Sequence, residues 1–110
     1  MSTVNPKFPN TGAISDQLAA DNARVANYVD GILGRVDQLV EAVSEGRWHD
    51  VRRISDYIAR SSATYQCPAI AVDARDVCIA TIETDNAEEI KRRIVKLIGT
   101  CGRESAKLNG

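Results

Sequence analysis

The sequence predicts an all-α protein: an antiparallel up-down bundle of four helices preceded by a short N-terminal helix. Apolar residues recur at steps of three and four along most of the chain, which is the period of amphipathic helices. Stretches rich in glycine, proline or asparagine separate these periodic segments. A chain of 110 residues suffices for one helical core. Long helices with short connections are satisfied most simply by an antiparallel bundle.

The N-terminal region predicts an arm followed by a short helix. Residues 1–12 combine prolines, asparagines and a glycine without periodicity, so we expect a flexible arm there and a single bundle domain over residues 13–110. Ile14 and Leu18 are four residues apart and share one helical face. This spacing predicts a first helix over about residues 14–20.

A long amphipathic helix is predicted from about residue 22 to 44. Its apolar positions are Val25, Tyr28, Val29, Ile32, Val36, Leu39, Val40 and Val43. Gly31 and Gly34 each cost about 1 kcal/mol relative to alanine inside a helix. We therefore expect packing to hold this helix and a neighbouring segment to approach closely at both glycines. Gly46 then supplies a left-handed helix stop.

Two further helices are predicted over about residues 48–65 and 68–83. Gln66-Cys67-Pro68 separates them, and proline suits the first turn of the second helix because its missing N–H needs no partner there. The expected inward-facing residues are Trp48, Val51, Ile54 or Ser55, Ile58 and Ser62 in the first helix and Ile70, Ala74, Val77 and Thr81 in the second.

The last predicted helix spans about residues 86–106. Thr84-Asp85-Asn86 followed by two glutamates is a helix start signal, with a capping side chain and then acids near the positive end of the dipole. The expected inward-facing residues are Ile90, Ile94, Leu97, Ile98 and Cys101, and the expected outward-facing residues are Lys91, Arg92, Arg93, Lys96 and Arg103.

The composition excludes several functional classes. A net charge of -1 argues against a general nucleic-acid-binding protein, which carries a basic excess. No apolar run approaches the ~20 residues that span a bilayer, so we expect a cytoplasmic protein that does not bind membranes. Cys67, Cys78 and Cys101 are expected to be buried thiols. With His49 they could supply a zinc site, but no CxxC pair is present, and we expect neither metal nor cofactor.

Residues 47–70 resemble the central hairpin of histidine-containing phosphotransfer (HPt) domains. The family signature runs His-x-Leu-Lys-Gly-Ser-Ser/Ala, and the same frame here reads Asp56-Tyr57-Ile58-Ala59-Arg60-Ser61-Ser62. The resemblance covers about residues 13–105 and includes Gly46-Arg47-Trp48, Ser61-Ser62-Ala63 and Pro68-Ala69-Ile70. It implies a four-helix bundle of this length with a short N-terminal helix across one end. It also implies that small residues let the two central helices pack tightly.

Three departures from the family pattern occur together in this frame. Asp56 replaces the phosphoacceptor histidine, Ala59 replaces the lysine that helps balance phosphate charge, and Arg60 replaces the glycine that lets a partner's active site come close. An aspartate accepts phosphoryl groups where neighbouring carboxylates hold Mg²⁺ and a lysine neutralises charge, and this helix offers no such set. The resemblance therefore implies an HPt shape without phosphate carriage.

The function implied is that of a non-catalytic signalling module, not an enzyme, that docks on receiver or histidine-kinase domains of a two-component phosphorelay. The expected partner-binding residues are Arg52, Arg53, Asp56, Tyr57, Ala59, Arg60 and Gln66. Arg60 is the residue we expect to face the clustered carboxylates of a receiver domain.

The same charges also fit a solvated surface with no partner. Arg52 and Arg60 each stand four residues from Asp56, as in an exposed ladder of ion pairs worth roughly 0.3 kcal/mol each. In this interpretation Asp50, Asp56 and Asp73 simply balance an arginine-rich face.

Two alternative functions remain open from the sequence. His49 lies seven residues before Asp56, about two turns and ~10.5 Å away on roughly the same face, and could be a displaced phosphoacceptor. The chain could also be a structural or oligomerising bundle unrelated to phosphorelay. The sequence does not determine the oligomeric state.

Overall fold

The protein is all-helical over the residues that the structure describes. The computed structural model describes the backbone of residues 11–109 and the side chains of residues 20–108. The helices are α1 (Thr11–Ser44), α2 (Trp48–Thr64), α3 (Pro68–Glu83) and α4 (Ala87–Asn109), and this part of the chain contains no strand. The prediction of an all-α fold with four long helices is confirmed. None of these helices combines the length and the apolar character needed to cross a membrane.

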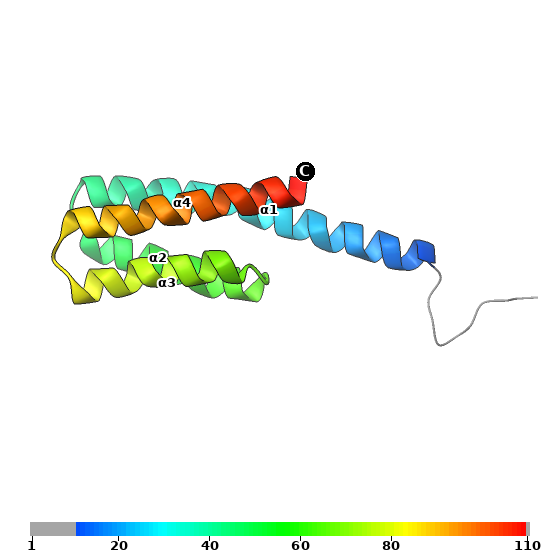
Figure 1. Cartoon of the computed structure of the whole chain (residues 1–110), viewed down its shortest axis with the longest axis horizontal. Helices are drawn as coiled ribbons and strands as arrows, with labels where there is room; N and C mark the ends of the chain where they lie inside the picture. Colours follow the sequence, from blue (N-terminus) through cyan, green and yellow to red (C-terminus); the bar gives the residue numbers. More distant parts are fainter. Residues whose placement is uncertain (1–10, 110) are drawn as a thin grey trace, which may run out of the picture.

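The four helices form a bundle in which each helix packs against two others. Helix α1 packs against α2 and α4, and α3 packs against the same two helices. Short connections join consecutive helices, and Figure 1 shows them lying in turn at one end of the bundle and at the other. The N-terminal part of α1 continues past the ends of its neighbours (Figure 1).

The prediction of a separate short helix before the first long one is wrong. The segments predicted over 14–20 and 22–44 belong to one continuous helix, which already includes Thr11 and Gly12. The reason is local: Ala19, Ala20 and Ala23 surround the expected break, and alanine has the highest helix propensity of all residues. Most of the predicted arm, and the side chains of Ile14 and Leu18, lie outside the described residues.

The core follows the predicted helical faces closely. Its fully buried members come from every helix and include Val29, Leu39, Val51, Ile58, Ile70, Val77, Leu97 and Cys101. Trp48 packs against this core while partly exposed. Two residues predicted inside lie at the boundary instead: Thr81 is half-buried, and Ile98 is 39% exposed. Both lie at the edge of an apolar face, where the neighbouring helix decides burial.

The helix ends explain why the chain reverses where it does. Gly46 has φ 69°, and the amide of Arg47 donates to the carbonyl of Ala42, as in a Schellman motif. Helix α2 ends in the same way with Gln66 at φ 59°, an unusual conformation for a residue with a side chain. The side chain of Asn86 accepts from the amides of Glu88 and Glu89 and so caps α4 as predicted.

The expectation of a close helix approach at Gly31 and Gly34 is wrong. Both glycines are exposed, and a Cβ atom added at either one would meet no atom within 4 Å. Both therefore have room for a side chain, although Gly31 shares a shallow surface hollow with Tyr57 of α2.

Replacing either glycine by alanine is therefore expected to stabilise the protein. Gly31→Ala and Gly34→Ala should each raise the free energy of unfolding by about 0.5–1 kcal/mol, because alanine loses less backbone entropy in a helix. Urea denaturation followed by circular dichroism measures the change. Gly46→Ala is the matched control and should lower stability by about 1 kcal/mol, since its φ of 69° disfavours a side chain. Destabilisation by Gly31→Ala would contradict the open space seen at that position.

Candidate functional site

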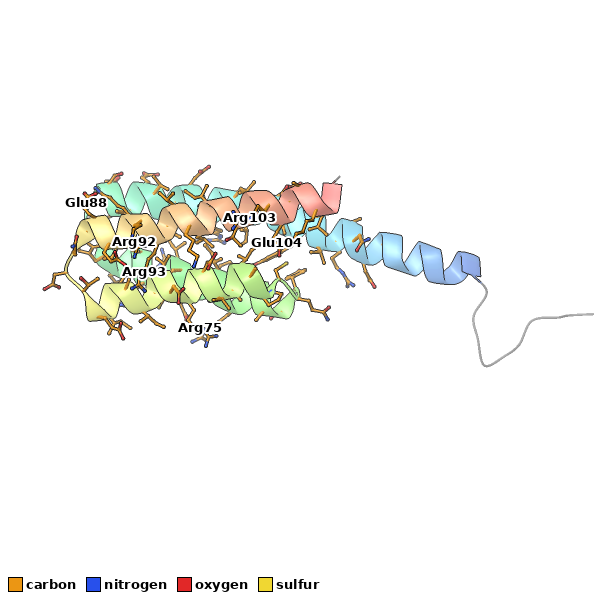
Figure 2. All side chains as sticks on the ribbon, viewed as in Figure 1. Arg75, Glu88, Arg92, Arg93, Arg103 and Glu104 are labelled. Carbon is orange, nitrogen blue, oxygen red and sulfur yellow. The ribbon has the colours of Figure 1, made fainter. Side chains whose placement is uncertain are left out.

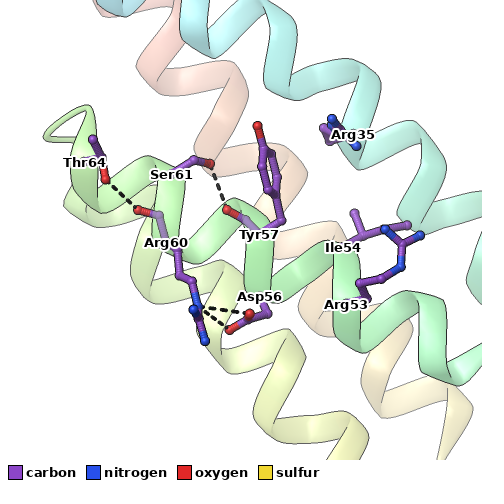
Figure 3. Close-up of a pocket in the computed structure, with 8 residues that line it drawn as sticks. All are labelled: Arg35, Arg53, Ile54, Asp56, Tyr57, Arg60, Ser61 and Thr64. Atoms are coloured by element: carbon purple, nitrogen blue, oxygen red, sulfur yellow. Dashed lines mark hydrogen bonds and ion pairs between the residues drawn. The ribbon is translucent and has the colours of Figure 1, made fainter.

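Asp56 lies on the outward side of α2. Ser55 and Ile58 beside it are fully buried, so α2 turns its opposite side to solvent. The side chain of Asp56 is 46% exposed, and one carboxylate oxygen lies 3.0 Å from Nε of Arg60, one turn later (Figure 3). The predicted ion pair with Arg60 is confirmed.

A surface hollow of about 520 Å³ opens beside Asp56. Its lining residues are Arg35 from α1 and Arg53, Ile54, Asp56, Tyr57, Arg60, Ser61 and Thr64 from α2 (Figure 3). The guanidinium carbon of Arg35 lies 4.6 Å from the centre of the Tyr57 ring, a cation–π distance. Three guanidinium groups and one carboxylate thus line the hollow; Arg60 pairs with Asp56, Arg53 lies 3.6 Å from Asp50 outside the lining, and Arg35 stacks on Tyr57.

The predicted ion pair between Arg52 and Asp56 is absent from the part of the chain that the structure describes. Arg52 instead donates from Nε to the Thr81 hydroxyl at 3.1 Å and from a terminal nitrogen to the Thr81 carbonyl at 3.2 Å. It therefore joins α2 to α3. The position of Arg52 on α2 allows its side chain to point toward Asp56 or toward α3. The acceptor groups of Thr81 on α3 decide between these two orientations.

The structure brings together only part of the predicted partner-binding set. Arg53, Asp56, Tyr57 and Arg60 line the hollow together, and Tyr57 is 48% exposed. Ala59 is only 4% exposed and belongs to the core, so its assignment to a contact surface is wrong. The reason is that Ala59 directly follows Ile58 on the buried side of α2.

Gln66 lies apart from the hollow, at the far end of α2. It is exposed at the turn into α3 and lines a different depression together with Asp21, Arg24 and Thr64. Arg52 also lies outside the hollow, against α3. The structure thus reduces the predicted surface to a compact group on α2, completed by Arg35, which the sequence analysis did not single out.

Tyr28 joins α1 to the end of α2. The sequence placed it on the apolar face of its helix but did not predict these contacts. Its hydroxyl forms hydrogen bonds with the hydroxyls of Ser61 and Ser62, the latter at 2.9 Å. Its ring stacks on Tyr65 with centroids 4.3 Å apart and planes 10° apart. Burial raises the pKa of Tyr28 above its usual value. The two serines were expected to serve packing between central helices; they also bind α2 to α1.

Asp73 is a buried carboxylate rather than part of a solvated arginine face. It is 6% exposed on α3 and accepts a hydrogen bond from the Thr100 hydroxyl of α4. Lys96 lies 3.8 Å from it, and Arg103 donates to the Thr100 oxygen at 3.0 Å. The prediction of a surface role is wrong because Asp73 faces α4, where these polar groups satisfy its charge.

The thiols and the histidine stand apart from the hollow. Burial raises the pKa of Cys101 to about 11 and that of Cys67 above its usual value, which disfavours reactive thiolates. Cys67 and Cys101 are buried as predicted, whereas Cys78 is half-exposed. His49 is exposed in the first turn of α2 and does not line the hollow. Within the described residues, no group of three His, Cys, Asp or Glu side chains is placed to hold a metal ion.

Comparisons with protein-family models, curated proteins and solved structures find no match to this chain.

Removing the Tyr28 hydroxyl is expected to destabilise the bundle. Tyr28→Phe keeps the stacked ring but deprives the fully buried Ser62 of its partner, so the free energy of unfolding should fall by about 1–2 kcal/mol. Tyr57→Phe is the matched control, because its hydroxyl forms no hydrogen bond with the described residues, and it should change stability by less than about 0.5 kcal/mol. Chemical denaturation measures both. Equal effects of the two substitutions would show that the hydroxyl contacts of Tyr28 contribute nothing.

Proposed function

We propose that this chain is a non-catalytic, HPt-like signalling module of the cytoplasm. It docks on a receiver or histidine-kinase domain of a two-component phosphorelay and does not carry phosphate. The proposed fold is the antiparallel up-down bundle of that family, with α2 and α3 as its central hairpin. The alternating placement of the three helix connections supports this topology.

The observation that carries the proposal is the charge around position 56. Arg35, Arg53 and Arg60 line the hollow, and Asp56 is the one acid among the described residues of its lining; Asp50, outside the lining, lies 3.6 Å from Arg53. Receiver domains present clustered carboxylates at their phosphorylation site, as the resemblance implies. Opposite potentials across an interface speed association and fix its register. A guanidinium group there would neutralise these carboxylates, as a bound metal ion does.

The same geometry argues against phosphate carriage through Asp56. An acyl phosphate on an aspartate forms where further carboxylates hold Mg²⁺ beside the acceptor. The hollow supplies a single carboxylate, and Arg60 already pairs with it. Among the described residues, the lining of the hollow thus offers charged groups for recognition without the further carboxylates that such a transfer uses.

Charge reversal at Arg60 tests the docking surface. We expect a purified receiver domain to bind the full chain in isothermal titration calorimetry, and Arg60→Glu to weaken binding at least about tenfold. Arg75→Glu is the matched control: Arg75 is exposed on α3, points away from the bundle (Figure 2), and forms no ion pair with the described residues. It should leave the affinity within about threefold. Equal weakening by both substitutions would indicate general charge attraction rather than a docking site.

Phosphoryl transfer tests the second half of the proposal. A receiver domain charged with radioactive acetyl phosphate should leave the chain unlabelled after incubation. An acid-labile, alkali-stable label that disappears in His49→Gln would instead make the protein a phosphocarrier that uses His49. A chain that binds neither receivers nor kinases, and that buries the α2–α3 face in a homodimer, would be a structural bundle.

A further inference from the structure

An apolar strip runs along the outer boundary between α1 and α4, away from the hollow beside Asp56. We define the α1–α4 strip as Leu33 and Val40 of α1 with Val95 and Ile98 of α4. These residues are 37%, 43%, 66% and 39% exposed, respectively. Leu33 and Val40 are seven residues apart and Val95 and Ile98 three apart, so each pair shares one helical face. Four large apolar side chains therefore meet solvent along one seam.

The seam is hollowed where the two helices meet. A depression of about 260 Å³ is lined by Val40, Val43, Ser44, Lys91, Ile94, Val95 and Ile98. This depression places Val40 and Ser44 of α1 alongside Val95 and Lys91 of α4. Further along α4, Gly102 is exposed, and a Cβ atom added there would meet nothing within 4 Å. The surface leaves room for another helix to approach.

The charges that border the strip differ between the two helices. On α1, Asp30, Asp37 and Glu41 are exposed and form no ion pair with any described residue. On α4, the exposed cation that lines the depression is Lys91, which forms an exposed ion pair with Glu88 of the same helix at 3.3 Å. Asp37 and Glu41 are four residues apart and repel each other, and neither forms an ion pair among the described residues. A partner that presents an apolar seam with basic residues beside it would relieve both the exposure and the repulsion.

We propose that the partner is a second copy of this chain, bound through the α1–α4 strip. The two-fold axis runs parallel to the helices, so α1 of one copy lies over α4 of the other. A rotation about such an axis preserves height along the bundle, so Val40 of each copy meets Val95 of the other and Glu41 approaches Lys91. A two-fold axis perpendicular to the helices would instead place α1 of one copy over α1 of the other, so that the acidic side chains of the two copies would face each other. Charge therefore selects the first arrangement.

This dimer does not rest on the proposed signalling function. Arg35, which lines the hollow beside Asp56, projects toward α2, whereas the strip lies on the side of α1 that faces α4. Both copies therefore keep the hollow open. A dimer of this kind would present two identical recognition surfaces to its partners.

Sedimentation equilibrium of the full chain tests the dimer. We expect a mass of two 12.0-kDa chains that dissociates on dilution. Val95→Glu should raise the dissociation constant at least about tenfold, because it places a carboxylate in the apolar seam. Val72→Glu is the matched control, since Val72 is 59% exposed on α3; it should leave the dissociation constant within about threefold. Circular dichroism checks that both variants remain helical.

A charge exchange tests the arrangement of the two copies. Glu41→Lys alone and Lys91→Glu alone should each weaken the dimer, and the double variant should restore it to within about threefold of wild type. A single-chain mass at concentrations up to about 1 mM would overturn the proposal. So would a dimer that tolerates Val95→Glu, that is weakened equally by Val72→Glu, or that the double charge exchange fails to restore.

Discussion

The burial of one side of α2 is the constraint from which the candidate site follows. Val51, Ile58 and Ser62 are fully buried, and a helix that buries these positions must turn Asp56 and Arg60 outward. The core contacts thereby place a carboxylate and a guanidinium on the surface, side by side. Any sequence change that rotated α2 would expose apolar side chains and bury charge at the same time, and both changes cost free energy.

Polar contacts between helices then fix how the surface of α2 joins its neighbours. Tyr28 of α1 binds Ser61 and Ser62, and Arg52 reaches Thr81 of α3. These contacts lie on opposite sides of α2 and hold its outward side between two neighbours. A rigid helical support of this kind suits a recognition surface, because little conformational entropy is lost when a partner binds.

Two surfaces of the bundle carry different chemistry on the same helix. One side of α1 contributes Arg35 to a basic hollow with α2, and the other contributes Leu33 and Val40 to an apolar strip with α4. The acids of α1 border the strip, whereas Arg53 and Arg60 of α2 line the hollow. Separating charge in this way lets a chain of net charge -1 carry a surface rich in arginine and an apolar surface on two different sides of α1.

The sequence by itself determined the helices, most of their ends and most of the core, because periodicity, capping by Asn86 and the left-handed turn at Gly46 are local properties. It also predicted that Asp56 faces outward beside Arg60, since both follow from the phase of one helix. Only the tertiary structure decided the partners of Tyr28, Arg52 and Asp73. Their positions on a helix allow more than one orientation, and the acceptor that selects among them lies on a neighbouring helix, distant in the chain.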